Sequence, residues 1–226
     1  MAEPGPTPDA PLPPAVDAWL AGRGFTLFPF QRETIAACRA GASGLVHSAT
    51  GSGKTLAAWL GPVCEALEER GGTGGPRVLW ITPLRALAAD IAVNLRAVVD
   101  GVGLDWEVAL RTGDTGASVR ARQRRRLPAG LVTTPESLSL LLSYPDTVRQ
   151  LASLRAVVVD EWHELLGNKR GVLLELGLAR LRTLAPRLRT WGLSATLGNT
   201  EEALSVLLGP GRAGHLVASD ADRPVV

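Results

Sequence analysis

Short apolar segments alternate along the chain with longer segments whose apolar residues recur every three or four positions. The short segments are rich in β-branched residues and predict buried strands, whereas the periodic segments predict amphipathic helices. We expect strands at 44–48, 77–82, 106–110, 130–134, 155–160, 189–195 and 214–219. We expect two short helices at about 15–25 and 30–41, followed by helices near 55–70, 84–99, 117–125, 135–143, 171–184 and 200–208.

This alternation of strands and helices predicts an α/β fold, with a mostly parallel sheet covered by helices on both faces. Ligands of such folds bind beyond the carboxyl ends of the strands, so functional residues are expected in the loops that follow them. Residues 1–14 are rich in proline and predict a disordered lead-in. Residues 15–213 should form one domain, and 214–226 should hold a last strand and the start of a linker. The glycine-rich stretch 70–77 predicts a flexible connector.

Composition excludes some classes of protein. The chain has 226 residues, of which 46% are hydrophobic, and a net charge of +2 that decides little. Cys38 and Cys64 are too few for a disulfide framework or a metal site, which favours a reducing compartment. No apolar run approaches the roughly 18 residues that span a bilayer, and the first residues lack the pattern of a secretory signal. We therefore expect a cytoplasmic protein that is not bound to a membrane.

The stretch "HSATGSGKTLAAW" (47–59) places glycines between a predicted strand and a predicted helix. Glycines let backbone N–H groups curl around an anion, and a helix N-terminus adds the positive end of its dipole. This stretch predicts a phosphate loop in which Lys54 reaches the β- and γ-phosphates and the Thr55 hydroxyl binds Mg²⁺. The residues expected to contact the nucleotide here are Thr50, Gly51, Ser52, Gly53, Lys54 and Thr55.

The alternative for this stretch is a glycine-rich turn with a solvated lysine. The strict phosphate-loop pattern has glycine where this chain has Ser48. However, lysine occurs only at positions 54 and 169, so nearly all other cations of the chain are arginine. A lysine in this loop therefore favours a specific role over ordinary solvation.

The stretch "RAVVVDEWHE" (155–164) places two acids at the end of a strand predicted to be buried. Buried acids are costly unless something compensates their charge, and a metal ion near the phosphate loop would do so. We expect Asp160 to hold Mg²⁺ and Glu161 to orient and deprotonate the attacking water. His163 could then relay the state of the nucleotide to another element. The alternative is that the acids act as helix N-caps.

Together, "ATGSGKT", "DEWH" and "SAT" (194–196) resemble motifs I, II and III of superfamily 2 helicases, in their order along the chain. That superfamily commonly departs from the strict glycine at the position of Ser48. The third motif implies that Ser194, Ala195 and Thr196 couple the nucleotide to the nucleic acid. The stretch "FPFQRETI" (28–35) resembles the Q motif, which implies that Gln31 contacts adenine and that Phe28 or Phe30 packs near the base.

Three further stretches resemble the nucleic-acid motifs of the same superfamily: "TPLRALAAD" (82–90) motif Ia, "RTGD" (111–114) the TGD motif and "TTPESL" (133–138) motif Ib. Phosphate and sugar contacts from such loops carry no sequence information, which suits an enzyme that moves along a strand. The residues that the resemblance places on one nucleic-acid strand are Thr82, Pro83, Arg85, Thr112, Gly113, Thr134, Pro135 and Glu136.

Two residue types leave alternatives open. The stretch "RARQRRR" (120–126) holds five arginines, which form either a phosphate-binding patch or a solvated helix face, with the two about equally supported. The tryptophans at 19, 59, 80, 106 and 191 fall in helix or strand patterns and are expected in the core. Trp162 is undecided between core and site, because its neighbours are the predicted catalytic acids.

The overall pattern is most similar to the large helicase-related (Lhr) family, in its ligase-associated branch, over about residues 15 to 220. The resemblance implies the first RecA-like P-loop domain of an ATP-dependent helicase that moves 3′ to 5′ on single-stranded DNA, or RNA, in DNA repair. Its ATP and Mg²⁺ would lie against a second RecA-like domain that supplies an arginine finger, and a DNA ligase or nuclease could be a partner.

Only 30 residues follow "SAT", so we expect motifs IV–VI to be absent and residues 1–226 to be nearly inactive alone. Two other functions remain as alternatives. Another P-loop phosphotransferase, such as a nucleotide kinase, would explain the phosphate loop but not "TTPESL" or "SAT". A non-catalytic module that binds nucleotide or nucleic acid would explain all of these motifs without turnover.

Overall fold

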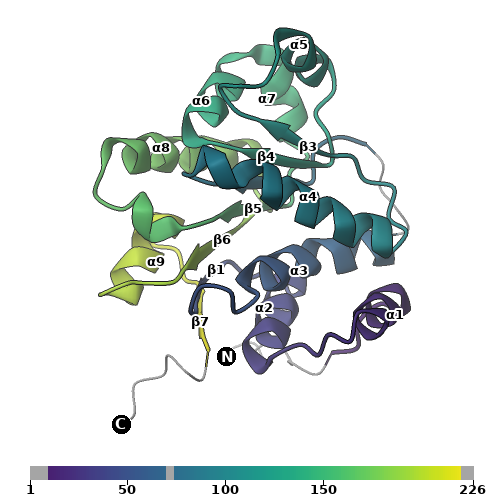
Figure 1. Ribbon diagram of the computed structural model, residues 1–226. Coiled ribbons are helices and arrows are strands. Elements are labelled where there is room, and N and C mark those ends of the chain that lie inside the picture. Colours follow the sequence, from purple (N-terminus) through teal and green to yellow (C-terminus); the bar gives the residue numbers. More distant parts are fainter. Residues whose placement is uncertain (1–9, 70–73, 220–226) are drawn as a thin grey trace.

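A single parallel sheet forms the centre of the protein. The computed structural model describes residues 10–69 and 74–219 (Figure 1). Every neighbouring pair of strands in this part is parallel, in the order β3-β4-β2-β5-β6-β1-β7. The strands are β1 (Gly44–His47), β2 (Val78–Ile81), β3 (Val108–Arg111), β4 (Gly130–Thr133), β5 (Ala156–Val159), β6 (Arg189–Ser194) and β7 (His215–Ala218). The predicted α/β fold with a parallel sheet is thereby confirmed.

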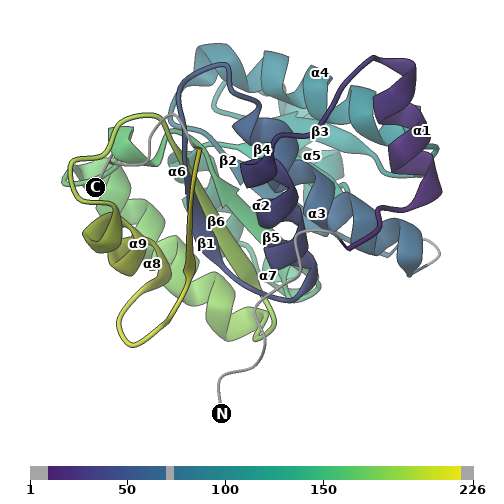
Figure 2. The same ribbon diagram turned by 90° about the horizontal axis from the view of Figure 1, so that it is seen from below.

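Helices cover both faces of the sheet (Figures 1 and 2). One face carries α1 (Pro14–Gly22), α2 (Pro29–Arg39), α3 (Lys54–Glu68) and α4 (Arg85–Gly101). The other carries α6 (Pro135–Ser143), α7 (Pro145–Leu151), α8 (Lys169–Leu184) and α9 (Thr200–Leu208). The helix α5 (Ala117–Arg125) lies near the β3 edge and contacts α7, and a short 3-10 turn, η1 (Trp162–Glu164), follows β5.

The alternation of side chains along the strands produces two hydrophobic cores. Val158 of β5 belongs to the core under α1–α4, whereas Val157 and Val159 belong to the core under α6–α9. All four residues of β5 are buried, as expected for a central strand covered on both faces. Packing in the two cores fixes where each strand ends along the sheet, and therefore where the loops that follow the strands lie.

The structure corrects several details of the sequence analysis. The third strand begins at Val108 and extends to Arg111, and α8 begins at Lys169 rather than at 171. The helix α7 was not predicted; Pro145 follows α6 closely and occupies the first turn of this new helix. Of the predicted lead-in, connector and linker, residues 1–9, 70–73 and 220–226 lie outside the described residues.

The tryptophans and cysteines lie mostly in the cores. Trp19 is only half-buried, against the expectation that it is a core residue. Trp162 is fully buried and donates a hydrogen bond from Nε1 to the Ala203 carbonyl at 2.9 Å, so it is a core residue. Both cysteines are free and buried, and burial raises the pKa of each thiol to about 12. Within the described residues, no helix combines the length and apolarity needed to cross a bilayer.

Candidate nucleotide and nucleic-acid site

The predicted motifs meet at one edge of the sheet. Because every strand pair is parallel, the carboxyl ends of all the strands lie at the same edge. Strand order places the loops after β3, β4 and β2 next to one another, followed by those after β5, β6 and β1. In that order, these loops begin with or contain Thr112, Thr134, Thr82, Asp160, Ala195 and Ser48. The predicted nucleic-acid residues therefore occupy one half of the edge and the predicted nucleotide residues the other half.

The phosphate loop (residues 48–55) has the backbone conformation that its glycines predict. Gly51 and Gly53 adopt positive φ angles of 80° and 88°, which other residues reach only with strain. Gly53 is the N-cap of α3 and offers no side-chain acceptor, so the first N–H groups of this helix lack a side-chain cap. Such a helix start favours an anion.

Lys54 lies in this loop rather than in solvent. Its Nζ donates hydrogen bonds to the carbonyls of Ser48 at 2.5 Å and Ala49 at 2.8 Å, and its side chain is largely buried. The Ser48 hydroxyl donates to the Ser52 hydroxyl at 2.8 Å, so the serine that replaces glycine takes part in the loop. The solvated-lysine alternative is wrong. Thr50 is exposed, and Thr55 is half-buried at the start of α3.

Gln31 connects α2 to the phosphate loop. Its Nε2 donates to the Gly53 carbonyl at 3.0 Å, and its Oε1 accepts from the Phe28 N–H at 2.8 Å. The side chain is 3% exposed. The structure thus gives each end of this amide a protein partner, and the contact of Gln31 with adenine stays a prediction.

A cavity of about 560 Å³ opens beside Gln31 and the phosphate loop. Phe28 lines it and is 58% exposed, and its ring is stacked near that of Phe30, with centroids 6.2 Å apart. Trp19 and Phe25, which the sequence analysis did not assign to a site, line the same cavity. The sequence signal that could have found them is their position, because both are aromatic residues shortly before the Q motif.

The acids after β5 differ in their surroundings. Asp160 is 8% exposed; it accepts hydrogen bonds from Trp80 Nε1 at 3.2 Å and from the Glu161 N–H at 3.0 Å. Burial, together with the nearby charge of Glu161, raises the pKa of Asp160 to about 6, although these hydrogen bonds and Lys54 act in the opposite direction. Glu161 has a φ of 45°; among the described residues, it is the only one other than glycine with a positive φ. This conformation costs energy, which is typical of functional sites.

His163 connects the acids to the third motif. Its Nδ1 lies 3.0 Å from the Ser194 hydroxyl oxygen and 3.6 Å from Glu161 Oε2. The Ser194 hydroxyl donates to the Thr196 carbonyl at 3.3 Å, which leaves its oxygen free to accept from His163. Ala195, which lies between Ser194 and Thr196 in the sequence, is half-buried. The two predicted motifs are therefore in direct contact, and their role in coupling stays a prediction.

The threonines of the nucleic-acid half of the edge hydrogen-bond within their own loops. The Thr82 and Thr112 hydroxyls accept from the N–H groups of Leu84 and Asp114, each at 3.3 Å, and Thr134 caps α6 by accepting from the Ser137 N–H at 3.4 Å. All three threonines are buried. Pro83 and Pro135 are also buried, whereas Arg85 and Gly113 are exposed and lie close to each other.

Arg170 is a residue of this site that sequence reasoning missed. It donates from Nε to Glu136 Oε1 at 2.6 Å, from Nη2 to Glu136 Oε2 at 3.3 Å and from Nη1 to the Pro83 carbonyl at 3.0 Å. Burial raises the pKa of Glu136, but the hydrogen bonds from Arg170, from its own backbone N–H and from Thr134, together with the charge of Arg170, hold the pKa of this carboxyl below its usual value. Glu136 therefore has a protein cation as its partner, and its predicted contact with nucleic acid stays untested.

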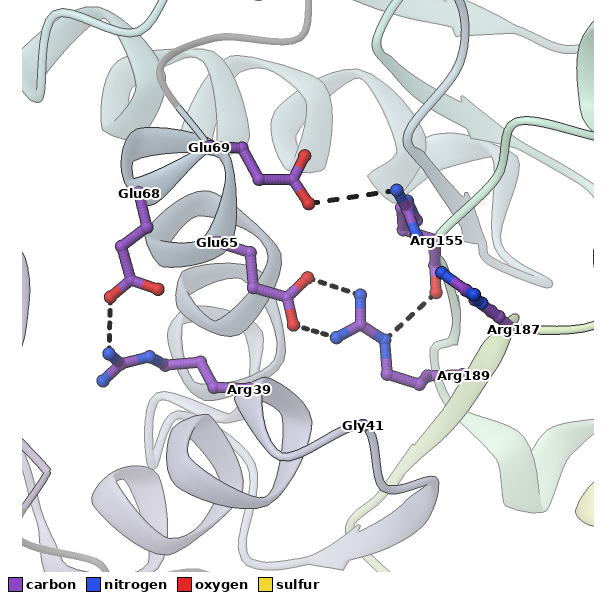
Figure 3. Close-up of a pocket in the computed structure, with 8 residues that line it drawn as sticks. All are labelled: Arg39, Gly41, Glu65, Glu68, Glu69, Arg155, Arg187 and Arg189. Atoms are coloured by element: carbon purple, nitrogen blue, oxygen red, sulfur yellow. Dashed lines mark hydrogen bonds and ion pairs between the residues drawn. The ribbon is translucent and has the colours of Figure 1, made fainter.

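Another cavity, of about 580 Å³, lies at the opposite edge of the sheet, and Figure 3 shows the residues that line it. Its charges compensate one another: Arg189 forms a two-bond ion pair with Glu65, and Arg39 pairs with Glu68 at 2.5 Å. Arg189 is buried, so this pair connects β6 to α3 inside the protein. This cavity is remote from the predicted motifs, and its ion pairs have a structural explanation.

The sequence matches a known family over most of its length. The model of the family described as DEAD/DEAH box helicase matches residues 28–204. The chain belongs to the DEAD/DEAH box helicase family. This match covers the phosphate loop, the acids after β5, the third motif and the three loops of the nucleic-acid half.

Within this family, the chain is similar in sequence to Lhr helicases. The chain is 38% identical over 215 residues to the ATP-dependent helicase Lhr-Core of Methanocaldococcus jannaschii, a match that covers 89% of this chain and 25% of that protein. It is 40% identical over 210 residues to the Lhr-Core helicase of Methanothermobacter thermautotrophicus, covering 88% and 24%. The chain spans about a quarter of the length of these curated relatives. The predicted resemblance to Lhr helicases is confirmed.

Solved structures of helicases have the same fold as this chain. The Mycobacterium smegmatis helicase Lhr bound to single-stranded DNA and AMP-PNP superposes with a TM-score of 0.82 at 34% identity, covering 94% of this chain and 28% of that one. The helicase MrfA bound to DNA gives 0.80 at 25% identity, covering 95% and 30%. The domain described here is therefore a helicase motor domain with a RecA-like fold.

Proposed function

We propose that this domain binds ATP and Mg²⁺ and acts as the first motor domain of an ATP-dependent helicase that moves 3′ to 5′ along single-stranded DNA in DNA repair. One observation carries the proposal. The order of strands places the phosphate loop and the acids after β5 at one half of the sheet edge, directly beside the three loops of the nucleic-acid half. The Lhr and MrfA helicases, each solved in complex with DNA, support it.

The residues of the nucleotide half suit Mg·ATP. Bound ATP supplies the phosphoanhydride bond whose hydrolysis drives movement. The uncapped start of α3 and Lys54 would hold the phosphates, and the aromatic cavity beside Gln31 would accept the base. Thr55 and Asp160 would hold Mg²⁺. The described residues contain no group of three or more metal-binding side chains, and Mg²⁺ typically takes most of its ligands from phosphate and water.

Glu161, whose backbone has a positive φ of 45°, would accept a proton from the attacking water. His163 contacts both Glu161 and Ser194, so a change at the acids reaches the third motif through one side chain. Arg170 then connects the helix that follows the acids to the nucleic-acid loops at Pro83 and Glu136. These contacts support a coupling of hydrolysis to strand binding.

Other parts of the proposal concern the longer protein. The curated relatives are about four times as long as this chain, which supports a second RecA-like domain that closes over the ATP and supplies an arginine finger. Single-stranded RNA is the alternative substrate. A DNA ligase or nuclease partner and a cytoplasmic location complete the proposal, and both follow from the resemblance and the composition alone.

The affinity for a fluorescent ATP analogue tests the nucleotide site. Lys54→Ala should weaken binding at least tenfold, or roughly 1.4 kcal/mol, because the phosphates lose their cation. Lys169→Ala is a matched control: it removes the same charge from an exposed position at the start of α8, and it should change the affinity less than twofold. Equal affinities of the wild type and Lys54→Ala would contradict the proposal.

A further inference from the structure

A third cavity adjoins the nucleic-acid half of the edge. It has a volume of about 440 Å³ and lies between α5, α6 and the end of β3. Thr112 and Gly113 of the TGD motif and Ser137 of motif Ib line one side of it. The cavity is therefore continuous with the proposed binding surface for the strand, although the walls from α5 and from Leu140 and Tyr144 belong to no motif.

Three arginines converge on this cavity. Arg120 and Arg124 are one turn apart on α5 and line it, together with Arg111 from the end of β3. Burial lowers the pKa of Arg111, and the positive charges of Arg120 and Arg124 add to this effect. Among the described residues, no carboxylate forms an ion pair with any of the three. Like charges that converge without a counter-charge create a potential that attracts an anion.

Hydrogen bonds hold two of these arginines, Arg111 and Arg120, in place. Arg111 Nη1 donates to the Arg120 carbonyl at 3.2 Å and lies 3.5 Å from Gln123 Oε1. Arg120 Nη1 donates to the Gly113 carbonyl at 3.2 Å, which connects α5 directly to the TGD motif. The cavity at the opposite edge of the sheet differs, because Arg39, Arg155 and Arg189 in its wall pair with glutamates (Figure 3).

The remaining wall is aromatic and apolar. The Arg124 guanidinium lies 5.0 Å from the centre of the Tyr144 ring, and Leu140, which is 57% exposed, lies on α6 beside it. Aromatic side chains accept nucleobases of any sequence by stacking, and an apolar side chain beside them adds contact area. Cations on one wall and an aromatic ring on the other match the two parts of a nucleotide.

We propose that this cavity binds one further nucleotide of the single strand, beyond those that the three motifs contact. Arg120 and Arg124 hold its phosphate, and Tyr144 and Leu140 hold its base. This inference rests on the proposed function. It also divides the arginine-rich stretch: all five arginines are exposed, but Arg120 and Arg124 line the cavity and Arg122, Arg125 and Arg126 do not.

Two double variants with equal loss of charge test the phosphate part. The affinity of the 226-residue chain for a fluorescent single-stranded oligonucleotide is measured by anisotropy over a series of salt concentrations. R120A/R124A should weaken binding at least tenfold and lower the slope of log affinity against log salt by about 0.7 per lost phosphate contact. R122A/R125A should weaken it less than threefold, with little change in slope.

Tyr144 tests the base part. Tyr144→Ala should weaken binding of the ordinary oligonucleotide about fivefold, whereas Tyr144→Phe, which keeps the ring, should change it less than twofold. With an oligonucleotide of the same length that lacks bases, Tyr144→Ala and the wild type should bind equally. Thermal unfolding of each variant shows whether the domain remains folded.

The outcomes separate this inference from the proposed function. Equal weakening by the two arginine pairs would mean that only net charge matters and would overturn the cavity. If Arg85→Ala weakens binding while R120A/R124A does not, the strand binds at the motifs and the inference alone fails. If the wild type binds no single strand under any condition, both fail.

Discussion

Arg170 and Glu136 form a two-bond ion pair across 34 residues of sequence, with Nε to Oε1 at 2.6 Å and Nη2 to Oε2 at 3.3 Å. Arg170 also donates to the Pro83 carbonyl, so one side chain joins the loops of motifs Ia and Ib. It belongs to α8, the helix that follows the acids of the nucleotide half. The loops predicted to hold the strand are thus fixed by a helix that starts close to the nucleotide site.

Arg170→Lys should weaken the binding of single-stranded DNA about threefold to tenfold, because lysine cannot form the two parallel bonds that position the loops. The pair is partly exposed, so the free energy of unfolding should fall by less than about 1 kcal/mol. Affinity for the ATP analogue should stay within twofold. Arg180→Lys, at an exposed position of the same helix, is the control and should change none of these values. Unchanged DNA binding of Arg170→Lys would show that the pair only stabilises the fold.

Glu161 provides a test of backbone strain. Its φ of 45° suits glycine, so Glu161→Gly should be more stable to urea than Glu161→Ala by about 1 kcal/mol. Both variants lack the carboxylate, and their difference therefore isolates the backbone. The same pair at Glu164, which lies in η1, should show the opposite order, because glycine is more flexible there in the unfolded chain. A less stable Glu161→Gly would show that the conformation carries no strain.

Asp160 predicts how stability depends on pH. Burial and the charge of Glu161 raise its pKa from 3.8 to about 6, so the folded domain binds the proton more tightly than the unfolded chain does. The stabilisation from this proton is complete below about pH 3.8 and is lost as the pH rises through about 6. The loss amounts to as much as about 3 kcal/mol.

Asp160→Asn removes this titration. The difference in the free energy of unfolding between the wild type and the variant, measured without nucleotide, should therefore shift against the wild type between pH 4 and about 6.5. Asp146→Asn, which changes an exposed acid, controls for the general effect of pH. A difference that stays constant over this range would mean that Asp160 is ionised equally easily in the folded and unfolded states.

Local patterns predicted the elements well and the contacts between them poorly. Buried strands are continuous apolar runs, so each expected strand is present, with its ends within about two residues. The helix α7 was missed because a proline can either end one helix or begin the next. The order of the strands depends on how the connections cross the sheet, which no local run of residues reveals.

In the site, too, local motifs were predicted and contacts between distant residues were not. The phosphate loop and the acids after β5 are short motifs whose spacing reflects their chemistry, and the structure brings them to one edge. Arg170 carries no such signal, because its partners Glu136 and Pro83 are 34 and 87 residues away. The arginine-rich stretch was undecided because only the packing of α5 against the β3 edge determines which arginines face a cavity.

The last prediction concerns what residues 1–226 do alone. They hold the phosphate loop, the acids and the third motif, all on one sheet edge. Under the proposed function, an arginine finger from a second domain is needed, and such a group is typically worth about 10³–10⁵ in turnover. We therefore expect the isolated chain to bind ATP weakly, to hydrolyse it very slowly with little stimulation by single-stranded DNA, and to separate no strands.

Adding a second RecA-like domain, fused or as a separate chain, should restore DNA-stimulated hydrolysis, because movement needs two domains that open and close around each ATP. Glu161→Gln in that two-domain protein should keep ATP binding and abolish hydrolysis, which separates the missing finger from a missing base. The deciding assay is DNA-stimulated ATPase activity of the isolated chain at several protein concentrations. Turnover of several per second that is lost in Lys54→Ala and rises with concentration would show that a second copy of this domain supplies the finger, and the requirement for a different second domain would be wrong.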